Sequence, residues 1–392
     1  MSKTAVYGFY YGEIAGFGST DAVSMLTRLD IHNVRNLAQV RLTDLSPANI
    51  LYGANGSGKT SVLESIHLLS AARSFRSYTA RSVISHGAGN LTVYGEVSSG
   101  NEERDARERS LGVQRHRNGD ADIRISGLPV RSAAHLAAEL PVLVLNSDSF
   151  DLLTGSPRDR RRFLDWGVFH VEHTFFTVWQ RYQRCIRQRN TLLRRGNIRD
   201  AELMSWTHEL AAAGESLTLS RQVYFSRLST RFAQVVASVL PDSLPVTLQF
   251  RRGWDRERSL LEVLNAGLVV DLEQGFTHSG PQRADIRILA GDASASDTLS
   301  RGQQKLVVSA LKLAQGHLFA EDGGGDRCIF LLDDLPSELD DEHLRLVCEE
   351  VEQTRAQVFI SCIDLADLHD VWRPPDPLSV FHVEHGQIVK EK

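Results

Sequence analysis

The octapeptide "GANGSGKT", Gly53–Thr60, constrains this chain more than any other segment. It satisfies the pattern G-x-x-x-x-G-K-[ST], in which glycines let backbone N–H groups turn inward toward phosphate oxygens. Such a loop needs a strand before it and a helix after it, because the helix N-terminus adds its dipole to the anion site. The apolar run "NILYG" precedes the loop, and Val62, Leu63 and Ile66 follow it at helical spacing. We therefore predict a strand–loop–helix phosphate site here.

Two side chains of the loop have expected roles of their own. Lys59 is expected to reach the β- and γ-phosphates of a nucleotide, and the Thr60 hydroxyl is expected to bind Mg²⁺. Lys59 is the only lysine between Lys3 and Lys305 in a chain that otherwise uses arginine, which indicates a need for a compact ammonium. The predicted nucleotide contacts of the loop are Gly53, Ala54, Asn55, Gly56, Ser57, Gly58, Lys59 and Thr60.

A second candidate element is the apolar run "CIFLLDD", which ends in Asp333 and Asp334. We expect Asp333 to hold Mg²⁺ and Asp334 to be the catalytic residue that orients or deprotonates the attacking water. Two adjacent carboxylates repel each other, so the pKa of one rises, which suits a base. The alternative, two solvated acids in a strand-to-helix turn, is disfavoured because the phosphate loop lies in the same chain.

The stretch "LSRGQQKL" has two compatible interpretations. Ser300 and Gln303 stand three residues apart ahead of an apolar-periodic run, which is the capping-box pattern of a helix start. The stretch is also close to the Ser-Gly-Gly-Gln signature with which one class of ATPase contacts a nucleotide. Ser300, Gly302 and Gln303 are therefore candidate nucleotide contacts, through N–H groups that the cap leaves free.

Composition excludes several classes of protein. No segment of the 392 residues approaches the roughly 20 apolar residues that a membrane span needs. The four cysteines form no C-x-x-C pair, which indicates free thiols in a reducing cytosol. The net charge of −5 means that any contact with DNA should be a local basic patch.

The pattern along the chain predicts two lobes. Residues 1–24 show no clear period and are expected to be a disordered extension or a product of a start codon assigned too early. Strands are expected over 26–31 and 37–42, with an antiparallel sheet region over 91–130, and helices from Ser156 to about 240. Further predicted elements are strands at 141–145, 246–250, 284–289 and 357–361, a turn at 323–325, and a second capping box of Ser337 and Asp340. We assign 25–145 and 320–392 to lobe I, and 146–319 to a helical lobe II.

The segment 181–199, "RYQRCIRQRNTLLRRGNIR", holds seven arginines and no acid. Arg181, Arg184 and Arg187 share one helical face. With Arg194 and Arg195 they form a candidate ridge for DNA phosphates. The alternative is a solvated face in an arginine-rich protein, and the sequence leaves both open.

The order phosphate loop, signature helix and acidic strand resembles the ATPase head of the ABC class. Thr60 and Ser300 are 240 residues apart, more than in transporter heads, and the long coiled coil of cohesin- and condensin-like heads is missing. An insertion of this size resembles the RecF family, as do "NVRNL", "RSFRS", "GSPRDRRRFLDWGVFH", "SGPQRADI" and "LLDDLPSELD". The resemblance implies an α/β fold, namely an ABC-type P-loop head with a mixed sheet and an inserted, mainly helical lobe.

The resemblance also implies a function. Family members are cytoplasmic proteins that bind ATP with Mg²⁺, form a homodimer on ATP, and hydrolyse it slowly as a DNA-dependent switch. They bind gapped duplex DNA at single-strand/double-strand junctions and, with RecO and RecR, help to load RecA in repair, replication restart and the SOS response. In such heads the signature serine faces the γ-phosphate that the other protomer holds, and Arg35 and Asn36 match positions near the nucleotide. The segment 358–364 lacks the histidine that many heads use to sense the γ-phosphate; Ser361 or Asp364 are possible substitutes.

Two alternatives come from other classes. An energising subunit of a membrane transporter would purify with membranes and show no affinity for DNA. A nuclease-linked ATPase would need an additional metal-carboxylate domain, for which no segment remains.

Overall fold

The computed structural model describes residues 24–77, 79–99, 107–195, 200–241, 245–324, 328–369, 371–372 and 377–391. The chain forms two compact units, one from the residues up to Ser149 together with those from Phe319 onward, the other from Phe150 to Leu318. The prediction for residues 1–24 lies outside the described residues, apart from Ser24, which begins the first strand. None of the described helices is both long and apolar enough to cross a membrane.

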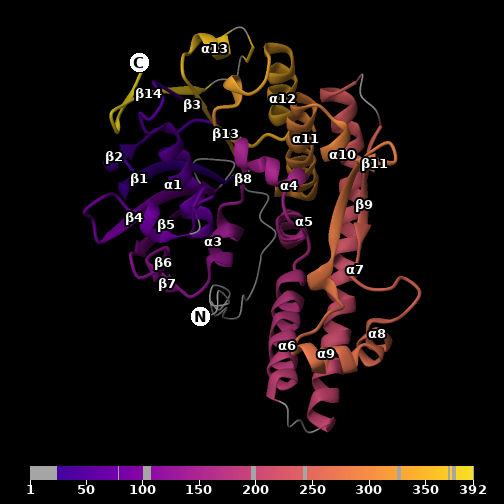
Figure 1. The fold of residues 1–392 in the computed structure, drawn as a ribbon. Coiled ribbons are helices and arrows are strands. Elements are labelled where there is room, and N and C mark those ends of the chain that lie inside the picture. Colours follow the sequence, from indigo (N-terminus) through magenta and orange to yellow (C-terminus); the bar gives the residue numbers. More distant parts are fainter. Residues whose placement is uncertain are drawn as a thin grey trace. The chain divides into compact units, whose positions relative to one another are not determined.

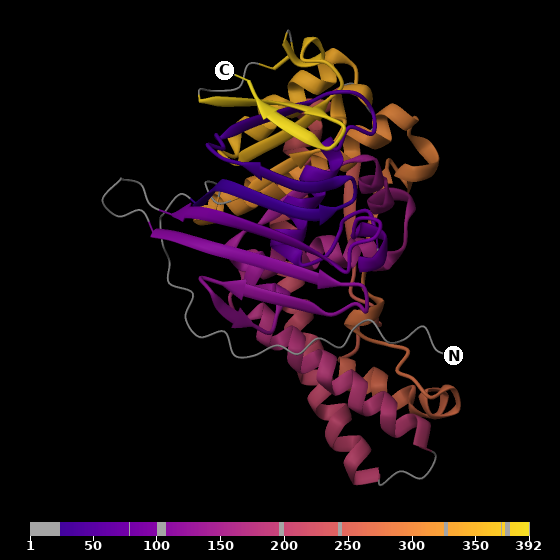
Figure 2. The same cartoon turned by 90° about the vertical axis from the view of Figure 1, so that its left-hand side faces the viewer.

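The first unit begins with an antiparallel sheet, seen with its strands side by side in Figure 2. Its order is β2 (Leu37–Leu42), β1 (Ser24–Val34), β4 (Asn90–Ser99), β5 (Arg107–His116), β6 (Ala121–Ile125) and β7 (Leu128–Val130). The antiparallel sheet predicted over 91–130 is confirmed. The strand predicted over 26–31 is too short, because β1 continues to Val34, which is buried and pairs with Leu37.

The second sheet of this unit places the carboxyl ends of its main strands at one edge. Its order is β15 (Gln387–Lys390), β14 (Leu378–Glu384), β3 (Ala48–Tyr52), β13 (Gln357–Cys362), β12 (Ile329–Leu332) and β8 (Val142–Leu145). All are parallel except β15, which pairs with β14 in the antiparallel sense. The sheet is therefore mixed, and the predicted α/β class is confirmed. Strands buried on both faces read as continuous apolar runs, as in β12.

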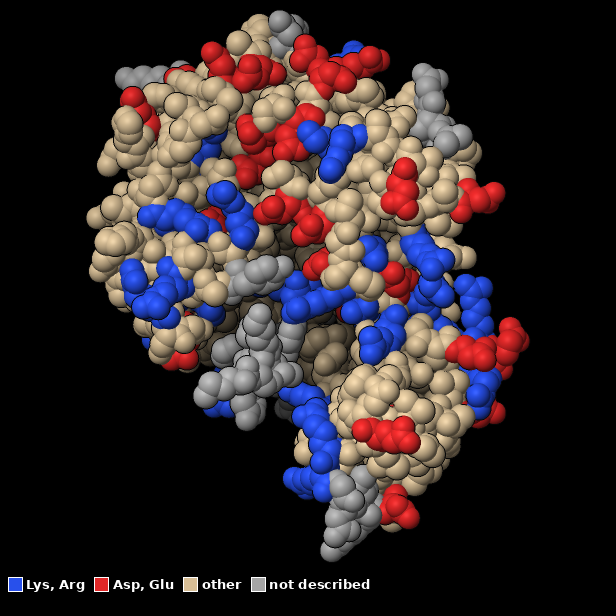
Figure 3. Space-filling view, viewed as in Figure 1, with Lys and Arg blue, Asp and Glu red and all other residues tan. Residues whose placement is uncertain are grey.

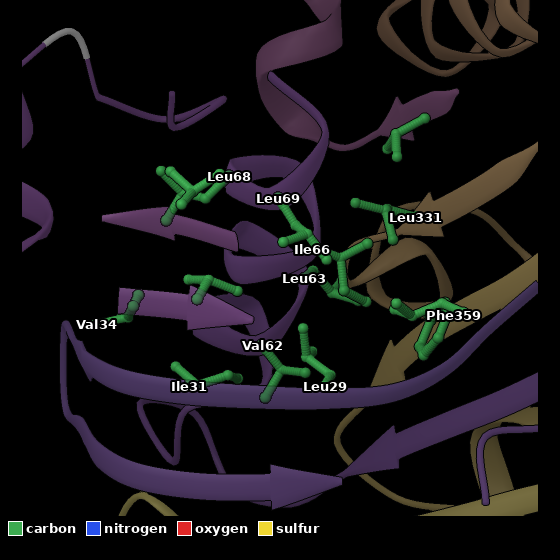
Figure 4. Close-up of a cluster of buried hydrophobic side chains, with 14 of the residues drawn as sticks. Leu29, Ile31, Val34, Val62, Leu63, Ile66, Leu68, Leu69, Leu331 and Phe359 are labelled. Carbon is green, nitrogen blue, oxygen red and sulfur yellow. The ribbon is translucent and has the colours of Figure 1, made fainter. Parts of the chain in front are cut away.

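Helix α1 (Lys59–Ala71) joins the two sheets into one core. In Figure 4, Val62 of α1 points toward Leu29 of β1, and Leu63 lies on the side of Phe359 of β13. α1 starts at Lys59, as the spacing of its apolar residues predicts. Packing against both sheets fixes the orientation of the helix, and with it the loop at its N-terminus.

The second unit is mainly helical (Figure 1). It contains α4 (Asp151–Thr154), α5 (Pro157–Val171), α6 (Phe175–Arg195), α7 (Asp200–Val239), α8 (Leu260–Ala266), α9 (Leu268–Gln274), α10 (Ala295–Thr298) and α11 (Arg301–Phe319). A small sheet of β9 (Val246–Arg251), β10 (Asp285–Ala290) and β11 (Ala293–Ser294) completes it. The long helices α6 and α7 lie side by side, and the helical stretch predicted to end near 240 is confirmed.

Short elements fill the rest of the first unit: α2 (Ala80–Val83), α3 (Ala133–Glu139), the π-helix η3 (Ala320–Gly324), the 3-10 helix η5 (Leu335–Ser337), α12 (Asp341–Gln353) and α13 (Ala366–His369). The predicted capping box of Ser337 and Asp340 is wrong. Ser337 ends η5, and Asp340 is itself the N-cap of α12, accepting from the His343 N–H at 3.0 Å. In the predicted glycine turn, Gly323 has φ 80°, whereas Gly325 lies outside the described residues.

Candidate nucleotide site

The phosphate loop leaves the end of β3 in a conformation that only glycine adopts easily. Gly53, Gly56 and Gly58 have φ angles of 146°, 79° and 127°. A Cβ atom at Gly53 would lie 2.2 Å from the carbonyl oxygen of Val383, so a side chain there is excluded by space as well. The local path of the loop is thus fixed by its own glycines.

Neighbouring segments fasten the loop from outside. The Gly386 N–H and the Asn36 side-chain amide both donate to the Ser57 carbonyl, at 2.9 and 3.0 Å. The Gly53 N–H donates to the Ile363 carbonyl at 3.2 Å. The Ser57 hydroxyl is buried and has no partner among the described residues. Because buried hydroxyls normally have partners, this one fits a site that takes a polar ligand such as phosphate.

Lys59 curls back over the loop. Its ammonium donates to the carbonyl oxygens of Gly53 and Ala54, the latter at 3.1 Å. The side chain is buried, and burial lowers the pKa of its ammonium, while the charge of Asp334 acts in the opposite direction. A partly desolvated cation attracts an anion more strongly than a solvated one.

The acidic strand meets the loop through one hydrogen bond. The Thr60 hydroxyl donates to Asp333 Oδ1 at 2.8 Å, across 273 residues of sequence. Burial raises the pKa of Asp333, and the hydrogen bonds from Thr60 and Ser361 oppose that rise. A hydroxyl and a carboxylate are hard oxygen ligands, so the donor set at this point suits Mg²⁺.

A cavity of about 400 Å³ opens beside this pair. Three of the predicted residues, Thr60, Asp333 and Asp334, line it. Sequence reasoning missed Arg76, Asn146, Asp148 and Glu338, which also line it. Asn146 directly follows β8, which runs parallel to β12. Its place at the end of the strand predicted at 141–145 is the signal for it in the sequence, but the pairing of β8 with β12 is needed to bring it to the same edge of the sheet as Asp333.

Arg35, which was expected near the nucleotide, is bound to a carboxylate of α1. Its guanidinium forms a two-point ion pair with Glu64 of α1, at 2.8 and 2.9 Å, and also donates to Ser77. It is not among the residues that line the cavity. The structure therefore gives Arg35 a role in anchoring α1, and its neighbour Asn36 is the residue that contacts the loop.

The predicted signature helix begins as its sequence indicates. The Gln303 N–H donates to Ser300 Oγ at 3.3 Å, and the Ser300 N–H donates to Gln303 Oε1 at 3.0 Å, so the capping box is confirmed. Ser300, Arg301 and Gly302 are exposed. A Cβ at Gly302 would meet nothing within 4 Å, so no packing inside the chain requires glycine there.

The arginines predicted to form a DNA ridge lie on α6, and Figure 3 shows basic side chains in a row along the edge where α6 lies. Arg181, Arg184, Arg187, Arg194 and Arg195 are all exposed. Arg181 forms an ion pair with Glu209, and the Arg184 guanidinium lies 5.9 Å from the centre of the Trp206 ring. The exposed face is thus present, with some of its charge already compensated.

One arginine of the segment is a core residue. Arg189 is fully buried, donates to Asp271 at 2.7 Å, and donates to the Thr207 hydroxyl at 3.0 Å. The count of seven arginines therefore overstates the charge of the surface. A buried ion pair of this kind holds α6 against α9, since breaking it would leave a charge without a partner.

Comparison with known proteins assigns the family. A family model described as "RecF/RecN/SMC N terminal domain" matches residues 25–388. "DNA replication and repair protein RecF" of Stutzerimonas stutzeri is 49% identical over 365 residues, which cover 93% of this chain and 97% of the relative. The chain belongs to the RecF family. The RecF protein of Azotobacter vinelandii is 50% identical over 366 residues, which cover 93% and 98% of the two chains.

Solved structures support the same fold. "Structure of the recombination mediator protein RecF-ATP in RecFOR pathway" matches with a TM-score of 0.81 at 24% identity, covering 96% of this chain and all of that one. An Smc head domain from Pyrococcus furiosus matches with a TM-score of 0.56 at 14% identity, covering 94% and 96%. These likenesses show the ATPase-head architecture shared by RecF and SMC proteins.

Proposed function

We propose that this RecF-family chain is an ATP-dependent DNA-binding protein of DNA replication and recombinational repair. It binds ATP with Mg²⁺, dimerises on ATP, and hydrolyses it slowly, with DNA as the stimulus. The observation that carries the proposal is the hydrogen bond between Thr60 and Asp333, since it joins the phosphate loop to the acidic strand at a cavity. The names of the curated relatives and the ATP-bound RecF structure support it.

In the proposed chemistry, residues of the first unit bind ATP and position the attacking water. Lys59 and the loop N–H groups hold the β- and γ-phosphates, and Asp334 at the cavity wall orients the attacking water. Mg²⁺, when bound by Thr60 and Asp333, neutralises charge on the phosphates. Excluding bulk water from this partly buried site strengthens each of these interactions.

The second unit supplies the part that acts on another molecule. The capping box uses the Gln303 N–H, and the N–H groups of Arg301 and Gly302 have no acceptor among the described residues. An exposed helix start with free N–H groups suits the γ-phosphate held by a second copy. Two ATP molecules would then lie between two chains related by two-fold symmetry.

The proposed lobes follow the sequence boundaries, 25–145 with 320–392 for the nucleotide and 146–319 for the helical lobe. The proposed DNA is gapped duplex with single-strand/double-strand junctions, contacted by the exposed arginines of α6. The proposed partners are RecO, RecR and RecA in the cytoplasm, where the chain would assist RecA loading. The RecFOR pathway named for the RecF–ATP structure supports the first two. Family membership disfavours the transporter-subunit alternative.

Calorimetric titration with ATP and Mg²⁺ tests the nucleotide part. Lys59→Ala should weaken ATP binding about ten- to a hundredfold, because it removes charge-assisted contacts to phosphate. Lys390→Ala, which removes an exposed lysine hydrogen-bonded to the Asp44 carbonyl, is the control and should leave affinity unchanged. Equal affinities of wild type and Lys59→Ala would contradict the proposal.

Salt-dependent binding to gapped duplex DNA tests the DNA part. The double variant Arg184→Glu/Arg187→Glu should weaken ATP-dependent binding and flatten its dependence on salt, because fewer counterions are released. Arg124→Glu makes the same kind of change at an exposed arginine of β6 and serves as the control. An unchanged salt slope in the double variant would reject the α6 ridge.

A further inference from the structure

Ser361 contacts both acidic residues of the site with a single hydroxyl. It stands near the carboxyl end of β13, in register with Leu51 of β3, and its side chain is fully buried. Its hydroxyl donates to Asp333 Oδ1 at 2.9 Å and accepts from the Asp334 N–H at 2.9 Å. The hydroxyl thereby ties the end of β13 to the two acidic residues that follow β12.

The first of these bonds sets the orientation of the Asp333 carboxylate. Thr60 and Ser361 both donate to Oδ1, at 2.8 and 2.9 Å. Oδ2 accepts no hydrogen bond from the described residues, and Asp333 lines the cavity. Two donors on one oxygen prevent rotation of the carboxylate and leave the other oxygen available to a cation.

The second bond holds the backbone of Asp334. Asp334 has φ 57° and ψ 29°, a left-handed conformation that is unfavourable for a residue with a Cβ atom. The neighbouring structure must impose it, and the Ser361 hydroxyl is the acceptor for its N–H. In this conformation the Asp334 side chain lines the cavity.

We infer that Ser361 is the positioning residue of the acidic pair: it aims Asp333 at the cation and Asp334 at the attacking water. Ser361 does not line the cavity, so it acts through the two carboxylates and not by contact with the nucleotide. The inference rests on the proposed binding of ATP with Mg²⁺. It also separates Ser361 from Asp364, whose carboxylate accepts from the Ala366 N–H and caps a local turn.

The variants follow from these contacts. Ser361→Ala removes the donor to Asp333 and leaves the Asp334 N–H without its acceptor, whereas Ser361→Thr keeps the hydroxyl. Ser379→Ala is the matched control, because Ser379 is a buried serine of the same sheet whose hydroxyl donates to the Asp44 carbonyl at 2.9 Å, away from the acidic pair. Ser361→Cys, with a weak S–H donor in a side chain of similar shape, replaces the alanine variant if that one does not fold.

The experiment measures ATP affinity by calorimetry in EDTA and along a Mg²⁺ titration, with hydrolysis as a second readout. In Ser361→Ala we expect the Mg²⁺-dependent gain in ATP affinity to fall about ten- to a hundredfold, with affinity in EDTA unchanged. Ser361→Thr should restore most of the gain, and Ser379→Ala should match the wild type. For hydrolysis, kcat should fall more than KM rises.

The outcomes separate the two proposals. A wild-type protein that binds no ATP would overturn the proposed function and this inference with it. A wild type that binds ATP with Mg²⁺, beside a Ser361→Ala variant with the same Mg²⁺ dependence as Ser379→Ala, would overturn the inference alone. An equal loss of affinity in EDTA would also overturn it, since Ser361 would then support the loop and not the cation.

Discussion

Two helix starts in this chain carry the nucleotide argument, and they are built in opposite ways. α1 begins at Gly58 with no side-chain cap, and its first residue, Lys59, is buried. α11 begins at Ser300 with a complete capping box, and its first residues are exposed. The first start lacks what a helix in isolation needs, and the second has it.

The difference indicates what each start requires from a ligand. At α1 no side chain caps the helix, and the buried Ser57 hydroxyl has no partner among the described residues, so polar groups there remain available to a ligand. At α11 the capping box satisfies the N–H groups of Ser300 and Gln303, so the helix start is capped without a ligand, while the N–H groups of Arg301 and Gly302 are left for a phosphate. Under the proposed function, the α1 start serves the single chain, whereas the α11 start would act only when another molecule brings a phosphate to it.

The largest expected effect on ATP affinity comes from replacing a glycine at each of the two helix starts. Gly53→Ala places a Cβ 2.2 Å from the Val383 carbonyl oxygen in a backbone conformation at φ 146°. We expect ATP affinity to fall more than about a hundredfold, or roughly 3 kcal/mol. Gly302→Ala meets open space and should leave ATP binding by the single chain unchanged. Calorimetry on both proteins checks this; equal effects would mean that the two helix starts do not differ as described.

A second prediction concerns the loss of folding stability caused by the buried carboxylate of Asp333. The pKa of Asp333 is raised above its usual value of 3.8, so ionised Asp333 reduces folding stability at neutral pH. Asp333→Asn should raise stability by about 1 kcal/mol at pH 7 and should abolish the effect of Mg²⁺ on ATP binding. The gain should shrink as pH falls through the raised pKa and vanish below about 3.8, where the acid is protonated in both states. The measurement is thermal melting of both proteins between about pH 3 and 7, the range over which a carboxyl group titrates. A stability difference that does not depend on pH would refute this account.

The smallest expected effect concerns the stability that the Ser300 cap gives to the start of α11. Ser300→Ala should lower stability by about 1 kcal/mol through loss of the cap and leave ATP binding by the single chain unchanged. Ser132→Ala removes a comparable N-cap, at α3, where the Ala134 N–H donates to the serine at 3.0 Å. Both variants should melt earlier by similar amounts, but only Ser300→Ala should reduce dimer formation on ATP, as measured by sedimentation. A normal dimer in Ser300→Ala would restrict Ser300 to its capping role.

Local rules accounted for the parts of the site that lie on continuous motifs. The loop glycines, the start of α1 at Lys59 and the cap at Ser300 each depend on a few adjacent residues, so spacing alone was informative. The apolar strand before Asp333 was equally clear, because a strand buried on both faces has no polar positions.

Contacts between distant segments were not predictable in the same way. Asn146, Asp148 and Glu338 reach the cavity because β8 and β12 are neighbours, and strand order is not written in any one segment. Arg35 was assigned to the nucleotide by its resemblance to family positions, but Glu64, 29 residues away, holds its guanidinium. Arg189 was counted among the seven arginines of the basic segment, although Asp271 keeps it in the core. In each case the partner lies far along the chain, and only the fold identifies it.

The most direct test of the account mixes two defective proteins. Lys59→Ala disables the α1 start, and Ser300→Arg blocks the α11 start; each protein alone should hydrolyse no ATP. In a mixed dimer one composite site carries both defects and the other carries neither, so an equal mixture should recover about a quarter of the wild-type rate on symmetry grounds. A mixture as inactive as its components would contradict the claim that the two helix starts act on one nucleotide from two chains.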